Sequence, residues 1–205
     1  TMILSTLQKF GFFATYGGIL EDKKEILKQT LQSPYDVIFT TGGASKGEAD
    51  FMRMVLEESG AKMLVNGIKI KPGKPTMVAK LGEKFIIALP GNPLSAGVLL
   101  RLLVLPFLRQ ISGAKSHYPQ VLEIKNANFM KLNNRAEVML GRIGEHGFCL
   151  TKEGKYNSGE ILPLAQSNAI ALFDESCKEV EKGANVKILP YETLWGDSVC
   201  DIANH

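Results

Sequence analysis

Glycines and a serine stand together where an apolar run ends, in the segment 40–50 with the sequence TTGGASKGEAD. Glycine lets a backbone approach a ligand closely, and successive N–H groups ahead of a helix supply partial positive charge. Ser45 adds a hydroxyl donor beside Gly42 and Gly43. The pattern matches neither the dinucleotide-binding nor the P-loop fingerprint. It predicts an anion-binding loop, with a plain tight turn as the alternative.

Asp50 follows this loop in what we expect to be the first turn of a helix. A carboxylate beside a phosphate-binding loop is well placed for Mg²⁺, which bridges carboxylate and phosphate oxygens. The alternative is that Asp50 only complements the positive end of the helix dipole. Asp50 is therefore the candidate Mg²⁺ ligand.

Two lysines lie in a proline-stiffened segment, Lys71-Pro72-Gly73-Lys74-Pro75. Proline fixes its own φ and biases the preceding residue toward extended backbone. A pair of unit charges 4 Å apart gains about 4 kcal/mol at an effective dielectric of 20, before desolvation. Two such cations in a stiff segment predict an oxyanion-binding site, and a plain basic turn is the alternative.

A third segment, 89–95 with the sequence LPGNPLS, combines a strand end, a rigid turn and a helix start. Asn92 suits the N-cap and Pro93 the first helical position, where the missing N–H of proline costs nothing. A helix N-terminus attracts negative charge. The segment predicts a second anion-binding turn, or else a turn that only connects two elements.

The elements that position these segments alternate between helix and apolar strand over residues 1–115. Such alternation is typical of an α/β sheet with helices on both faces. Asp22 is well placed to cap the second helix. The expected helices are 2–10, 22–32, 51–59 and 92–112, and the expected strands are 12–16, 36–40, 62–65, 68–70, 76–80 and 85–89.

Residues 118–192 contain only short apolar runs separated by Gly, Asn and Asp. This pattern predicts a small all-β, barrel-like domain. Gly, Ser and Pro cluster at 114–119, so we expect the domain boundary there and a tail at 193–205. The expected strands are 121–124, 138–140, 148–150, 161–164, 169–173 and 186–189.

The composition is that of a globular protein, with 205 residues, 45% apolar and 22% charged. A net charge of +3 is too small to argue for nucleic acid and suits an anionic small ligand. The three cysteines form no CxxC pair, so neither a zinc site nor a disulfide framework is expected. The apolar stretch 94–108 contains Pro and Arg and is shorter than a membrane span. We expect a cytoplasmic protein with no signal peptide and no contact with membrane.

The three segments TTGGASKGEAD, IKPGKP and LPGNPLSA, in this order and spacing, resemble the molybdopterin molybdenumtransferase family of the MoeA and gephyrin E-domain type. The resemblance covers nearly the whole chain. Residues 1–115 resemble the MogA-like, three-layer molybdopterin-binding subdomain, and 118–192 resemble the C-terminal β-barrel subdomain. It implies the C-terminal portion of such a protein, with the first strand and its TGDEL-type acidic segment expected before Thr1.

The resemblance implies insertion of molybdate into adenylylated molybdopterin, with Mg²⁺-dependent release of AMP. The alternatives are a non-catalytic molybdopterin-binding scaffold and the adenylyltransferase of the same pathway. Related proteins act as homodimers, and the implied partners are the pathway's adenylyltransferase and the molybdoenzymes that receive the cofactor. No nucleic-acid partner is implied.

The resemblance also implies roles for particular residues. Arg142 is assigned with Arg135 as the reserve, and Glu21 is the alternative to Asp22. The implied catalytic residues are Asp22, Asp50, Pro90, Pro93, Arg142 and Ser158, with Asp50 also linked to the metal. The implied ligand-binding residues are Thr41, Gly42, Gly43, Ser45, Gly47, Glu48, Lys71, Gly73, Lys74, Gly91, Asn92 and Ser95.

Overall fold

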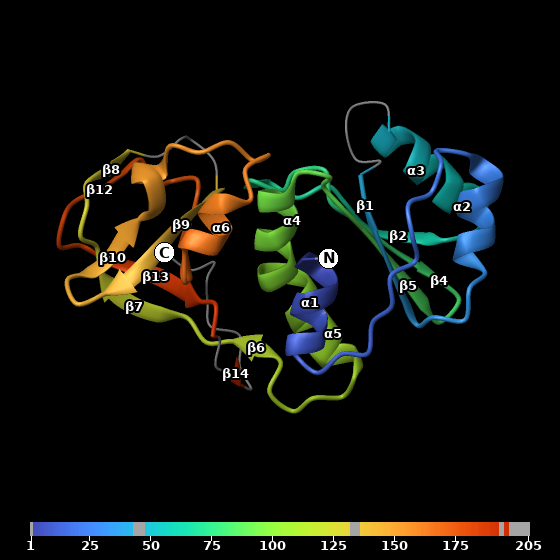
Figure 1. The fold of residues 1–205 in the computed structure, drawn as a ribbon, viewed down its shortest axis with the longest axis horizontal. Coiled ribbons are helices and arrows are strands. Elements are labelled where there is room, and N and C mark those ends of the chain that lie inside the picture. Colours follow the sequence, from blue (N-terminus) through green and yellow to red (C-terminus); the bar gives the residue numbers. More distant parts are fainter. Residues whose placement is uncertain (1, 43–47, 132–135, 193–194, 197–205) are drawn as a thin grey trace. The chain divides into compact units, whose positions relative to one another are not determined.

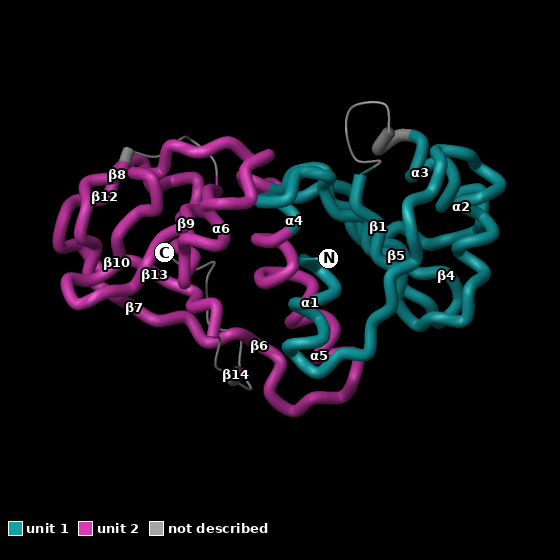
Figure 2. The backbone as a smooth tube through the Cα atoms, in the orientation of Figure 1, with its two compact units in different colours: residues 1–68, 73–96 teal, residues 69–72, 97–205 magenta. Residues whose placement is uncertain are grey.

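The computed structural model describes residues 2–42, 48–131, 136–192 and 195–196 (Figure 1). The chain forms two compact units, and a short segment of the second, residues 69–72, interrupts the first in the sequence. Residues 1–68 and 73–96 form the first unit, and residues 69–72 and 97–205 form the second (Figure 2).

The first unit is built on a four-stranded sheet in the order β1-β5-β4-β2. Parallel pairing joins β1 to β5, whereas β4 pairs antiparallel with both β5 and β2. The turn between β4 and β5 contains Gly82 at a φ of 60°, a conformation that glycine adopts readily. The predicted hairpin is therefore present. The strands are β1 Val37–Thr41, β2 Lys62–Asn66, β4 Met77–Leu81 and β5 Lys84–Leu89.

Helices α2 and α3 cover one face of this sheet. Leu27 and Leu31 of α2 and Val55 and Leu56 of α3 join one buried cluster with strand residues such as Ile86. Side chains that alternate to the other face of the strands are also buried, including those of Val78, Ile87 and Leu89. The sheet is thus buried on both faces, as in α/β proteins. The helices of this unit are α1 Met2–Lys9, α2 Lys24–Leu31 and α3 Glu48–Glu58.

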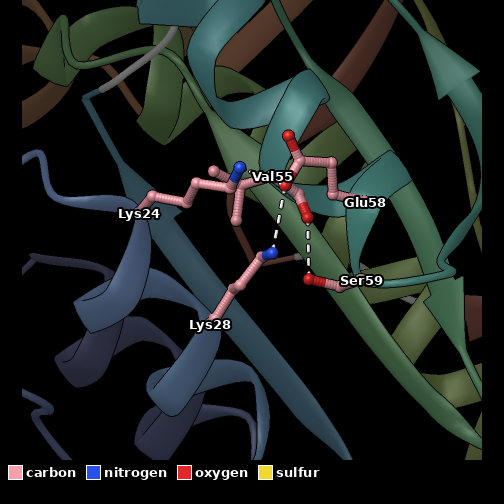
Figure 3. Close-up of polar contacts among 5 residues, drawn as sticks. All are labelled: Lys24, Lys28, Val55, Glu58 and Ser59. Atoms are coloured by element: carbon pink, nitrogen blue, oxygen red, sulfur yellow. Dashed lines mark hydrogen bonds and ion pairs between the residues drawn. The ribbon is translucent and has the colours of Figure 1, made fainter.

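Ion pairs join the exposed edges of α2 and α3 (Figure 3). Lys28 Nζ lies 3.0 Å from Glu58 Oε2, and Lys24 pairs with the same carboxylate. These two lysines lower the pKa of Glu58. Because the groups are exposed, these ion pairs contribute little to stability.

A continuous helical stretch, Pro93–Ile111, comprises α4 Pro93–Leu99, a π-helical turn η1 Leu100–Val104 and α5 Leu105–Ile111. The π turn ends at Val104, two residues before Pro106, which lacks the N–H that an α-helix needs there. Among the described residues, this stretch alone is long and apolar enough to cross a membrane. Its apolar side chains, including Val98, Leu100 and Val104, are buried in the protein, as in the core helix of a soluble domain.

The second unit is built on an antiparallel sheet in the order β10-β9-β11-β13-β7, with β3 pairing parallel to β9. Asn126, just after β7, forms a bridge with Phe148 of β10, and the Ala127 N–H donates to the Phe148 carbonyl at 2.9 Å. The two ends of the sheet therefore meet, which gives the barrel-like form expected. The strands of this sheet are β3 Ile70–Lys71, β7 Leu122–Lys125, β9 Ala136–Gly144, β10 Gly147–Leu150, β11 Ala169–Phe173 and β13 Asn185–Pro190.

The barrel interior is apolar, and short elements border the sheet. Phe148, Ala169, Ala171, Val186 and Ile188 form its buried cluster. Two small antiparallel pairs accompany it, β8 with β12 and β6 with β14. The bordering elements are β6 Tyr118–Pro119, β8 Met130–Lys131, β12 Glu179–Val180, β14 Trp195–Gly196, the 3-10 turn η2 Thr151–Gly154 and the helix α6 Leu162–Gln166.

Two predicted strands are wrong. No strand forms over 12–16, where Phe13 is 94% exposed and no described strand pairs with it. The run 161–164 is the start of helix α6. Pro163 fits the first turn of a helix, whereas in a strand it could not donate to the ladder.

The predicted start of the second helix is also wrong. Helix α2 begins at Lys24 with Lys23 as its N-cap residue, so Asp22 lies one residue too early to cap it. The first helical hydrogen bond runs from the Leu27 N–H to the Lys23 carbonyl at 3.1 Å. That register places Asp22 in the exposed segment ahead of the helix.

The compact units divide the chain within α4, whereas the sequence placed a boundary at 114–119. Side-chain stacking explains why the second half of this helical stretch goes with the second unit. The Arg101 guanidinium lies 4.1 Å from the centre of the Tyr191 ring, and that of Arg109 lies 4.5 Å from the Trp195 ring. Such cation–π contacts are favourable for half-buried arginines.

Candidate functional site

Two of the three candidate segments meet at one edge of the first sheet. Strands β1 and β5 are parallel with Thr41 opposite Leu89, so their carboxyl ends lie side by side. A Cβ added to Gly91 would lie 3.2 Å from the Gly42 Cα. The backbones of the two loops therefore touch, and position 91 has little room for a side chain. In open α/β sheets, ligands bind beyond this edge.

Helix N-termini follow both loops. Helix α3 begins at Glu48, and α4 begins at Pro93 with the Ala96 N–H donating to the Asn92 carbonyl at 3.0 Å. That bond is the one expected when Asn92 is the N-cap residue. Gly91 and Asn92 are exposed, whereas Pro90 and Ser95 are buried. The turn thus presents its backbone to solvent on a rigid base, a suitable arrangement for an anion.

Several predicted residues lie outside the described residues. These are Gly43, Ser45 and Gly47 of the first loop and Arg135, the reserve arginine. For Glu48 and Asp50 the structure places the backbone at the start of α3, and their side chains lie outside the described part. Thr41 and Gly42 are described, at the end of β1 and directly after it.

Thr40 is a candidate that the sequence analysis did not single out. Its side-chain Oγ1 is buried and has no hydrogen-bond partner among the described residues. A buried hydroxyl without a partner is costly, so it marks a place where a ligand or neighbouring loop can bond. The position could have been identified from the sequence because Thr40 follows the apolar run 37–39 and lies two residues before Gly42.

The third segment, KPGKP, is divided between the two units. Lys71 belongs to the second unit and Lys74 to the first, and the Lys71–Pro72 peptide bond is cis. Within the first unit, buried Thr76 donates its hydroxyl to the Gly73 carbonyl at 2.8 Å, and the Ile68 N–H donates to the Lys74 carbonyl at 3.0 Å. These bonds fix the backbone while the Lys74 side chain stays exposed.

Lys71 is held by a carboxylate that the sequence analysis missed. Its Nζ lies 2.9 Å from Oε1 of Glu137, a residue only 5% exposed on β9. Nearby, the Tyr156 hydroxyl accepts a hydrogen bond from the Leu140 N–H at 2.7 Å. Burial raises the pKa of Tyr156, and the charge of Glu137 raises it further. A lone glutamate in a strand carries no sequence signal of such a pairing.

The remaining predicted residues are exposed or half-buried. Asp22 is exposed, and its alternative Glu21 is exposed and pairs with Lys23. Arg142 is exposed on β9, where its guanidinium donates to the Gln166 carbonyl at 3.2 Å. Ser158 is half-buried in the turn that precedes α6.

A second buried phenol lies in the second unit. Burial raises the pKa of Tyr191 to about 12, although the stacked Arg101 opposes the rise. The neighbouring Ser167 hydroxyl is shared with Thr151 and donates to the Pro163 carbonyl at 2.6 Å. The Ser167 hydroxyl also lies close enough to the Tyr191 phenol to oppose the rise of its pKa.

The described residues contain no group of three His, Cys, Asp or Glu side chains that could hold a metal ion. The predicted ligand, Asp50, has its side chain outside this part of the chain. Arg142, Ser158 and Lys71 belong to the second unit, and the two touching loops belong to the first. The structure therefore gives the geometry of one part of the candidate site, the two touching loops after β1 and β5.

Two family descriptions match the chain. Residues 1–110 match "Probable molybdopterin binding domain", and residues 125–191 match "MoeA C-terminal region (domain IV)". The first match covers more than half of the chain and contains all three candidate segments.

Curated relatives agree with these matches. A "Molybdopterin molybdenumtransferase" of Haemophilus influenzae is 32% identical over 187 residues, which are 87% of this chain and 46% of that protein. One of Staphylococcus epidermidis is 27% identical over 186 residues, 89% of this chain and 44% of that protein. This chain thus spans less than half the length of these relatives.

A solved structure shares the fold. The "molybdopterin biosynthesis moea protein" of Pyrococcus horikosii superposes with a TM-score of 0.76 at 23% identity, covering 93% of this chain and 47% of that one. The fold and the paired loops define an α/β domain of the molybdopterin-binding class followed by a barrel-like β domain. Within that class, the chain belongs to the MoeA family, whose curated members are named molybdopterin molybdenumtransferases.

Proposed function

We propose that this chain is the part of a molybdopterin molybdenumtransferase that binds the adenylylated pterin and the oxyanion. In the proposed reaction, the two dithiolene thiols of the pterin form two Mo–S bonds to molybdate, and one molybdate oxygen leaves as water with the two thiol protons. Water cleaves the phosphoanhydride bond, AMP leaves, and molybdenum-bound molybdopterin remains. The coarser role, in molybdenum cofactor biosynthesis, follows from the family to which the chain belongs.

The observation that carries the proposal is the contact between Gly42 and Gly91 at the carboxyl ends of β1 and β5. Each loop leads into a helix, so backbone N–H groups and two helix N-termini serve the same edge of the sheet. A diphosphate ester is the kind of ligand such a pair suits. We assign the pterin and AMP phosphates to this edge.

The proposal gives distinct tasks to the charged residues. Asp50 would help hold Mg²⁺, which would neutralise phosphate charge when bound. Lys71 and Lys74 would attract the molybdate oxyanion. Asp22, Arg142 and Ser158 would keep the catalytic roles that the resemblance implies, and Pro90 and Pro93 would make the second loop rigid.

The proposed setting is a cytoplasmic homodimer, with the small-molecule substrates as ligands. The protein would receive its adenylylated substrate from the pathway's adenylyltransferase and pass its product to molybdoenzymes. A non-catalytic scaffold would bind the pterin without releasing AMP. An adenylyltransferase would consume ATP.

The test measures AMP release and molybdenum incorporation by the full-length protein supplied with adenylylated molybdopterin, molybdate and Mg²⁺. We expect Asp50→Asn to abolish both while circular dichroism shows an unchanged fold. Asp36→Asn is the matched control, because Asp36 is exposed directly before β1, at the opposite end of the strand from the loop pair.

Three results would contradict parts of the proposal. Full activity of the Asp50→Asn protein would remove Asp50 from the catalytic residues. Pterin binding without AMP release by the unaltered protein would indicate a scaffold. ATP-dependent adenylylation of molybdopterin would indicate the adenylyltransferase instead.

A further inference from the structure

The pairing of Lys71 with Glu137 is built into the sheet of the second unit. Strand β3 lies parallel to β9 with Lys71 directly opposite Glu137. The ammonium Nζ donates to the carboxylate Oε1 over 2.9 Å. The Glu137 side chain is 6% exposed, whereas that of Lys71 is 53% exposed. One partner is therefore a buried anchor, and the other reaches solvent.

A buried carboxylate needs a charged partner because its desolvation is costly. Glu137 therefore holds the Lys71 ammonium more firmly than an exposed glutamate would. An ammonium carries three N–H donors, and this ion pair uses one of them. The other donors of Lys71 remain for solvent or a ligand at its exposed side.

The second lysine of the KPGKP segment differs from the first. Lys74 is exposed, and within the described residues its ammonium has neither an ion pair nor a hydrogen bond. The segment therefore combines one ammonium held by an ion pair with one that is exposed and has no such pair among the described residues. The two lysines cannot be distinguished in the sequence. The pairing of Lys71 on β3 with Glu137 on β9 distinguishes them in the structure.

We infer that Glu137 is a positioning residue, which holds the Lys71 ammonium in place for the oxyanion substrate. The inference rests on the proposed function. A preorganised cation binds an anion without first losing the rotational freedom of a long side chain. Lys74 then supplies the adaptable positive charge of the segment.

The sign of one substitution separates positioning from simple electrostatics. Glu137→Gln removes a negative charge beside Lys71, so a purely electrostatic effect would lower the KM for molybdate. Loss of the fixed position of the Lys71 ammonium would instead raise the KM for molybdate. We expect the KM for molybdate to rise about three- to tenfold, the range that immobilising one long side chain implies, with kcat little changed.

The experiment compares molybdate-dependent turnover of the full-length protein and its variants at saturating pterin substrate. Glu153→Gln is the matched control, because it removes the exposed ion pair of Glu153 with Lys155, also in the second unit. It should leave the KM unchanged. In a Lys71→Ala background, Glu137→Gln should add no further rise, since the group to be positioned is gone.

A second readout reports on Lys71 without turnover. In ¹H–¹⁵N spectra of the lysine ammonium groups, the Lys71 signal should be visible in the unaltered protein and lost in Glu137→Gln. If Glu137→Gln does not fold, Glu137→Asp keeps the charge and shortens its reach, and should give a smaller rise in KM.

The outcomes distinguish the inference from the proposed function. Absence of turnover in the unaltered protein would overturn the proposed function and the role inferred from it. Turnover in the unaltered protein with an unchanged or lowered KM in Glu137→Gln would overturn the positioning role alone. A rise in KM that persists in the Lys71→Ala background would also overturn it.

Discussion

Gly91 lies so close to Gly42 that a Cβ on Gly91 would come within 3.2 Å of the Gly42 Cα and 3.4 Å of its nitrogen. The two residues are separated by one described helix and four described strands in the sequence, and they meet because β1 and β5 are parallel neighbours. The contact fixes the spacing of the two loops from which the proposed phosphate site is built.

Replacement of Gly91 by Ala should push the two loops apart by a few tenths of an ångström. We expect a loss of stability of roughly 1 kcal/mol, typical of a mild overpacking, and a larger relative loss of affinity for AMP or molybdopterin. Calorimetric titration and urea unfolding measure the two effects. Gly17→Ala is the control, because a Cβ at Gly17 meets nothing within 4 Å. Equal affinities in the two variants would count against the loop pair as the site.

Two threonines with buried hydroxyls should respond differently to the loss of those hydroxyls. Thr76 donates to the Gly73 carbonyl, so Thr76→Val should destabilise the protein by about 1–3 kcal/mol. Thr40 has no such partner among the described residues, so Thr40→Val should be neutral or slightly stabilising. Urea unfolding without ligand gives both values. A large loss in Thr40→Val would show that its hydroxyl already has a partner in the free protein.

The buried phenol of Tyr191 should make stability fall at high pH. Its pKa is raised to about 12 in the folded protein, against about 10 in an unfolded chain. Stability from this residue is fully present below pH 10 and is lost as the pH rises through 12, because the unfolded chain releases the proton first. Between pH 9 and 11 the loss is on the order of 1 kcal/mol.

The free energy of unfolding at pH 9 and pH 11 checks this prediction when the unaltered protein is compared with Tyr191→Phe. The phenylalanine keeps the stacking of Arg101 and lacks the phenolic proton. The Tyr191→Phe protein should therefore lose less unfolding free energy between pH 9 and pH 11. Tyr16→Phe, at an exposed position, should behave like the unaltered protein. Identical losses in all three would contradict the assignment to Tyr191.

Local sequence determined most of the elements and the family. Apolar runs such as 36–40 predicted β1, and the spacing of two strands about Gly82 predicted the β4–β5 hairpin, because these patterns reflect neighbouring residues. The glycines of TTGG and the prolines of LPGNP marked both loops, since backbone freedom and rigidity depend on residue type. The order of the three segments pointed to the family that the matches show.

Only the tertiary structure decided which of these residues meet. The adjacency of Gly42 and Gly91 follows from the parallel pairing of β1 with β5, and the capture of Lys71 by Glu137 follows from the pairing of β3 with β9. Strand order and register depend on long-range packing, which no local pattern encodes. The same reason explains the failure at 12–16, where a β-prone run has no described strand to pair with. Sequence therefore specified the loops and the charges, and the order of the strands decided which of them act together.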